Sequence, residues 1–142
     1  MSANFNYRSG LSSAGAYQLS GVPYMSGSGA TIPGGMVGPP YQVTFPYITK
    51  WITVENTGGT ALRVGFSDLG VQGISENAYF TIPAASAGNP LNRLELDVRV
   101  KDIYLFGDGD TTTAQIAAGL TLVPVEQLTG TNSNWSGSSG VG

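Results

Sequence analysis

The stretch that decides the fold class is residues 94–106, LELDVRVKDIYLF. Leucine and valine alternate here with charged residues over eight positions, which is the period of a strand with one buried face. The alternation changes phase at Asp102, where an apolar residue is due. We therefore expect a bulge or a break near Lys101 and Asp102 that restores the register.

Shorter β-rich segments surround this strand. They are residues 41–45, 47–55, 60–66, 78–82 and 113–125, the last with Ile116, Ala118, Leu120 and Leu122 in phase. We expect residues 60–66 to form a hairpin with 47–55 across the turn Asn56-Thr57-Gly58-Gly59, and residues 69–74 to be an irregular strand or a loop. Six or seven short strands with frequent turns predict an all-β fold, a single antiparallel β-sandwich or jelly-roll-like domain.

The charges divide the chain into three parts, because every charged residue except Arg8 lies between Lys50 and Glu126. We expect an extended Gly/Pro-rich arm at residues 1–40, a β-sandwich domain at 41–126 and a flexible Gly/Ser tail at 127–142. Between Gly21 and Pro40 half of the residues are Gly or Pro, a density that disfavours a helix or a central strand. The apolar residues scattered through the arm indicate docking on a partner, and folding back on its own domain or staying mobile are the alternatives.

The composition argues against several classes of function. The chain has no Cys and no His, which removes thiolate chemistry, the commonest general base and the commonest transition-metal ligand. It has only 6 Lys and Arg and a net charge of −3, so neither nucleic acid nor an anionic membrane surface is an expected partner. No apolar stretch approaches the roughly 20 residues of a membrane span, and the N-terminus lacks the pattern of a secretory signal.

Three patterns could carry chemistry, and each has a plainer interpretation. Glu95 and Asp97 could act as a catalytic carboxylate pair, but the neighbouring Arg and Lys residues favour a ladder of ion pairs. The sequence Asp108-Gly109-Asp110 resembles the start of a calcium loop, but the later ligands of an EF-hand are missing and Asp-Gly favours a turn. Trp51 could offer a stacking platform for a sugar, although core packing is the commoner role. We expect no enzyme activity, no cofactor and no metal.

Contacts between subunits are the expected use of the remaining conspicuous residues. In the arm these are aromatic residues and methionines, along residues 93–101 they are charges, and in the tail there is one tryptophan that could anchor it. The candidates for subunit contact are Tyr7, Tyr17, Tyr24, Met25, Met36, Arg93, Glu95, Asp97, Arg99, Lys101 and Trp135.

Residues 45–58, 62–67, Tyr79-Phe80 and 99–105 carry a resemblance that extends over about residues 45–123. The chain resembles small β-sandwich proteins of virus and phage particles, namely jelly-roll-like minor capsid, penton or decoration subunits. The resemblance implies a homo-oligomer, a trimer or pentamer, that sits with a major capsid protein in the capsid shell or on its surface. The basic arm of many genome-packaging coat proteins is absent, which favours a surface or vertex position.

The function expected from the sequence is therefore a structural protein of a virion. Two alternatives stay open. A self-assembling extracellular filament subunit would use the arm to complete a neighbour's sheet. A carbohydrate-binding or adhesin module would use Trp51.

Overall fold

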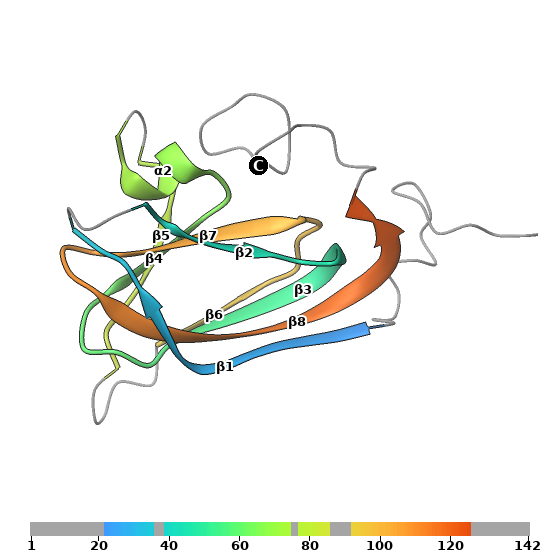
Figure 1. Cartoon of the computed structure of the whole chain (residues 1–142), viewed down its shortest axis with the longest axis horizontal. Coiled ribbons are helices and arrows are strands. Elements are labelled where there is room, and N and C mark those ends of the chain that lie inside the picture. The colour runs from blue at the N-terminus through green and yellow to red at the C-terminus, as the bar shows by residue number, and fades with distance from the viewer. Residues whose placement is uncertain (1–21, 36–38, 75–76, 86–91, 126–142) are drawn as a thin grey trace, which may run out of the picture.

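The computed structural model describes residues 22–35, 39–74, 77–85 and 92–125. Over these residues the chain forms eight strands and one short helix (Figure 1). The elements are β1 (Val22–Ile32), β2 (Tyr41–Thr44), β3 (Tyr47–Asn56), β4 (Leu62–Gly65), α2 (Asp68–Gln72), β5 (Phe80–Ile82), β6 (Arg93–Leu96), β7 (Asp102–Gly107) and β8 (Thr112–Pro124).

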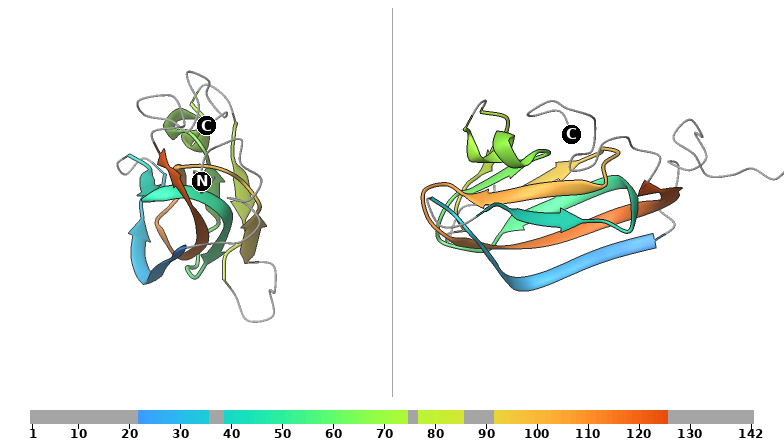
Figure 2. Two further views of the ribbon diagram at one scale, coloured as in Figure 1. Left: turned by 90° about the vertical axis from the view of Figure 1, so that its right-hand side faces the viewer. Right: turned by 45° about the horizontal axis from the view of Figure 1, so that its top comes forward.

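The strands form two four-stranded antiparallel sheets packed face to face (Figure 2). Sheet A has the order β1-β8-β3-β6, and sheet B has the order β2-β7-β4-β5. The first strand pairs with the last and each following strand pairs with the next one in from the end, which gives the pairs β1·β8, β2·β7, β3·β6 and β4·β5. One long hairpin rolled into two layers gives this order, which is the connectivity of an eight-stranded jelly roll. The predicted all-β sandwich is confirmed.

The core lies between the two sheets and is filled from both inner faces. Ile52 and Val54 of β3 and Leu120 of β8 are buried from sheet A, and Leu62 and Leu105 are buried from sheet B. Sheet B is also covered on its outer side, where Val71 of α2 packs against Tyr104 and Phe106 of β7. Every residue of β7 is consequently buried. The outer face of sheet A has no such helix over it in the described part of the chain.

Strand β1 corrects the expectation that residues 1–40 form an arm outside the domain. Val22–Ile32 pairs antiparallel with β8 as the edge strand of sheet A, with a register shift between Ser26 and Ala30. The described part of the predicted arm thus folds back on its own domain. The high Gly and Pro content fits an edge strand with an irregularity, since only one side of such a strand must be paired.

The predicted hairpin between residues 47–55 and 60–66 is wrong. Strand β3 pairs with β8 and β6 in sheet A, whereas β4 pairs with β5 and β7 in sheet B. The Asn56–Gly59 turn therefore carries the chain from one sheet to the other. Asp108-Gly109-Asp110 is a turn as predicted, with Gly109 at a φ of 95°, but it likewise joins the two sheets.

The break expected near Lys101 and Asp102 marks a change of sheet. Strand β6 ends at Leu96 in sheet A, and β7 begins at Asp102 in sheet B. The crossing residues are held by β3, because the Thr49 hydroxyl donates to the Val98 carbonyl at 2.6 Å and accepts from the Val100 amide at 3.1 Å. The predicted strand over residues 94–106 is thus two strands.

Two further expectations fail for local reasons. Residues 69–74 were expected to be an irregular strand or loop, yet α2 forms there because Ser67 caps its N-terminus and Gly73 adopts a φ of 73° at its C-terminus. Leu122 is 56% exposed and does not share the buried face of Leu120. The pairing of β8 with β3 shifts register near this point.

Candidate functional site

The outer face of sheet A has no helix packed over it in the described part of the chain. Its middle row crosses all four strands, from Met25 of β1 to Ala117 of β8, Thr53 of β3 and Glu95 of β6. The residues of this row alternate with core residues along each strand, so their side chains point away from sheet B. We call this surface the outer face.

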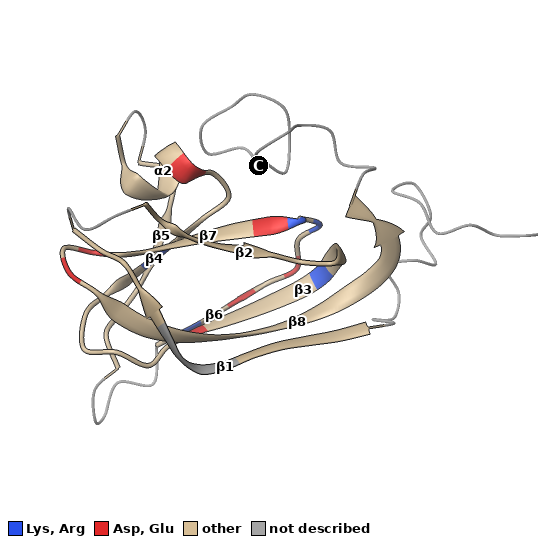
Figure 3. Ribbon diagram, in the orientation of Figure 1, with Lys and Arg blue, Asp and Glu red and all other residues tan. Residues whose placement is uncertain are grey.

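Charge is distributed unevenly over the outer face. Strands β1 and β8 carry no charged residue, whereas the charges of this face lie on β3 and β6 (Figure 3). The Arg93 guanidinium and the Glu95 carboxylate lie 3.7 Å apart, and both side chains are exposed. An exposed ion pair of this kind contributes little to stability. Its main consequence is that the β6 edge is charged and the β1 edge is neutral.

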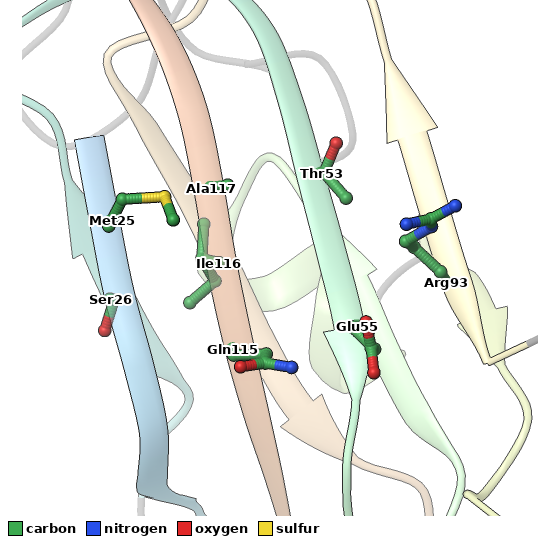
Figure 4. Close-up of a pocket in the computed structure, with 8 residues that line it drawn as sticks. All are labelled: Met25, Ser26, Thr53, Glu55, Arg93, Gln115, Ile116 and Ala117. Carbon is green, nitrogen blue, oxygen red and sulfur yellow. The ribbon is translucent and has the colours of Figure 1, made fainter. Parts of the chain in front are cut away.

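A shallow groove of about 270 Å³ runs across the outer face (Figure 4). The Met25 side chain extends from β1 toward Ala117 of β8, and Gln115 extends from β8 toward Glu55 of β3. Met25 is 78% exposed, more than the other exposed large apolar side chains of the described residues. The groove is open and smaller than most pockets for small molecules, so its form suits contact with another protein surface better.

A second feature lies beside the groove, around Trp51. Trp51 is half-buried and pairs across the strands with Gly119 of β8, while its neighbours toward β6 are Glu95 and Asp97. The ring is not among the residues of the hydrophobic core. An aromatic ring beside two carboxylates on an open surface is an arrangement that can bind a polar ring such as a sugar. Among the described residues, Glu95 and Asp97 border an open surface and no enclosed pocket, which is a poor setting for a catalytic carboxylate pair.

The structure brings together three of the predicted contact residues. Met25, Arg93 and Glu95 lie on the outer face, Asp97 and Arg99 are exposed where the chain leaves β6, and Lys101 is half-buried. The residues of the predicted ladder of ion pairs do not all lie on one strand, because β6 ends at Leu96.

Tyr24 has a different position. Its ring packs edge-on against Phe45, with 5.0 Å between the ring centroids, so it lies at the margin of the core. Tyr7, Tyr17, Met36 and Trp135 lie outside the described residues.

Sequence reasoning missed Thr53, Gln115 and Ala117 as parts of this surface. None of them carries a reactive group, so no motif marks them. The usable signal was that residues 22–32 and residues 112–124 both lack charged side chains. These two segments form one uncharged surface only because β1 pairs with β8.

The described residues contain no cluster of three or more His, Cys, Asp and Glu side chains that could hold a metal ion. The same part of the chain contains no helix long and apolar enough to cross a membrane. Comparison of the chain with protein-family models, with curated proteins and with solved structures gives no match.

Proposed function

We propose that this chain is a non-enzymatic structural subunit of a virus or phage particle, a minor capsid, penton or decoration protein that binds copies of itself and a major capsid protein. The observation that carries the proposal is the uncharged half of the outer face, formed by β1 and β8 of a jelly roll.

Charge depletion is the compositional mark of the centre of protein interfaces. A long edge strand normally carries charges that prevent unwanted pairing. Strand β6 has such charges in Arg93 and Glu95, whereas the 11-residue β1 has none. The β1 side of sheet A is therefore suited to contact with another chain, and the β6 side is suited to solvent.

The assignment to a virion adds an analogy of fold to this surface argument. Jelly rolls are frequent in viral capsid proteins and also in lectins, and a fold alone does not fix a function. The resemblance of residues 45–123 to capsid accessory proteins favours the first of these two uses. The expected location is the capsid shell or its surface.

Light scattering tests the proposal directly. We expect the full chain to form a closed trimer or pentamer, and Met25→Lys to dissociate it by placing a charge on the neutral half of the outer face. Thr44→Lys is the matched control, because Thr44 is exposed on β2 of the other sheet. A deletion of residues 1–21 keeps β1 and shows whether the preceding part of the arm contributes to the mass of the oligomer. A monomeric full chain at every concentration contradicts the proposal, and open-ended growth favours a filament subunit.

A carbohydrate-binding module is the second candidate, and the position of Trp51 outside the core favours it. In that case Trp51→Ala abolishes glycan binding while the circular dichroism spectrum stays unchanged. A glycan array on which the wild-type chain binds nothing rejects this candidate.

A further inference from the structure

The inner face of sheet B has a gap at its β5 edge. Phe80 pairs with Val64 across β5 and β4, so the two side chains point to the same side of the sheet. Val64 is 3% exposed, and Phe80 is 60% exposed. A phenylalanine on the core side of a sandwich is therefore largely open to water.

The gap is a crevice of about 300 Å³ between the two sheets. Sheet B contributes β4, β5 and the residues beside them, and sheet A contributes two leucines of β6. The lining residues are Val64, Gly65, Phe66, Ala78, Tyr79, Phe80, Leu94 and Leu96, and none of them is charged. Strands β5 and β6 are the edges of their sheets, so no further strand of the described chain closes the sandwich here.

We infer that the C-terminal tail of the same chain docks in this crevice, with the Trp135 side chain against Phe80. Residues 127–142 contain no charge, and from Thr129 onward the only large apolar side chain is that of Trp135. An uncharged segment enters an apolar crevice without the cost of desolvating ions. A tryptophan buries a large area for the few torsions that it must fix.

The tail is long enough to reach the crevice. Pro124 at the end of β8 pairs with Tyr47, and Leu96 in the crevice pairs with Ile52. Tyr47 and Ile52 are five residues apart on β3, which is about 17 Å at the rise of a strand. The ten Cα–Cα steps from Val125 to Trp135 span up to about 33 Å when extended.

Effective concentration favours the chain's own tail over that of a second copy. A tethered segment of this length is present at its target at roughly millimolar concentration. A second copy that is free in solution competes only when the protein itself approaches that concentration. The inference concerns a single chain and is independent of the proposed function.

Tryptophan fluorescence tests the inference. Trp51 and Trp135 are the 2 tryptophans of the chain, so Trp51→Phe leaves Trp135 as the sole emitter. We expect emission at shorter wavelength than from a free peptide of residues 126–142, and severalfold weaker quenching by acrylamide. Phe80→Glu in the crevice abolishes both differences, whereas Ile74→Glu does not, because Ile74 is 66% exposed and does not line the crevice.

Three outcomes overturn the inference. The first is Trp135 emission that equals that of the free peptide. The second is emission unaffected by Phe80→Glu, which places Trp135 elsewhere. The third is a blue shift that grows with protein concentration together with the mass, which assigns the crevice to a second copy's tail. If Trp51→Phe does not fold, fluorotryptophan labelling of the wild-type chain gives the same answers, with Trp135→Phe assigning the resonance.

Discussion

The Thr112 hydroxyl donates a hydrogen bond of 2.8 Å to Oδ1 of Asn56, and both residues are buried. Asn56 ends β3, and Thr112 begins β8. The Asn56 amide nitrogen also donates to the carbonyls of Thr60 at 2.7 Å and Pro83 at 3.0 Å, which lie beyond sheet A. One side chain thus joins the end of sheet A to the segments that lead into and out of sheet B.

Asn56→Ala should lower the free energy of unfolding by about 2 to 4 kcal/mol, because it leaves several buried groups without partners. Chemical denaturation measures the loss. Asn77→Ala is the matched control, since Asn77 is exposed, and it should change stability by less than about 0.5 kcal/mol. Equal effects of the two substitutions contradict the assigned role of Asn56.

The crossing from β6 to β7 depends on Thr49 in the same way. Thr49→Val keeps the shape of the side chain but removes both hydrogen bonds to residues 98 and 100, and should cost about 1 to 3 kcal/mol. Thr53→Val on the outer face of β3 serves as the control and should be nearly neutral. If the two valine variants unfold at the same denaturant concentration, Thr49 does not hold the crossing.

The strands themselves could be predicted because their signal is local. Alternation of apolar and polar residues identified residues 47–55, the first half of 94–106 and residues 113–120. The assignment of strands to sheets could not be predicted, because it depends on contacts between residues far apart in the chain. The Asn56 turn resembles a hairpin turn in its residues, and the change of sheet is evident only from the pairing of β3 with β8 and of β4 with β7.

The surface was harder to predict than the fold. Met25, Arg93 and Glu95 were singled out from the sequence as candidates for subunit contact, but the position of Met25 on the same sheet face as the other two depends on the pairing of β1 with β8. That pairing was concealed by the Gly and Pro content of residues 21–40, which suggests an arm. The crevice at Phe80 could not be predicted either. Alternation in β5 predicts the face of the sheet on which Phe80 lies, but it does not predict where the opposite sheet ends.

Gly107 lies where backbone segments approach closely. A Cβ atom at this position would lie 1.8 Å from the Asp110 carbonyl oxygen, far inside contact distance, and its nearest neighbours would be backbone atoms that side-chain rotation cannot move. Gly107→Ala should therefore cost about 3 kcal/mol or more in thermal or chemical unfolding. Gly59→Ala is the control, because nothing lies within 4 Å of its added Cβ. A Gly107→Ala protein as stable as Gly59→Ala would show that this loop adjusts freely.

Stability should fall at alkaline pH because of Tyr104. Burial raises the pKa of the Tyr104 hydroxyl above 10.0, and the negative charges of Asp102 and Asp68 raise it further. Below about pH 10 the folded and unfolded states both keep this proton, so the group contributes no pH dependence. As the pH rises above that value, the unfolded state loses its proton first, and stability declines through the folded pKa.

Tyr104→Phe should therefore make the decline above about pH 10 less steep, as measured by urea denaturation at a series of alkaline pH values. Phe106→Leu is the control from the same buried cluster, because it lowers stability without removing a titrating group. We expect it to shift the whole profile downward and to leave its slope unchanged. If the free energy of unfolding declines with the same slope above about pH 10 in the wild type and in Tyr104→Phe, other groups cause the alkaline loss of stability.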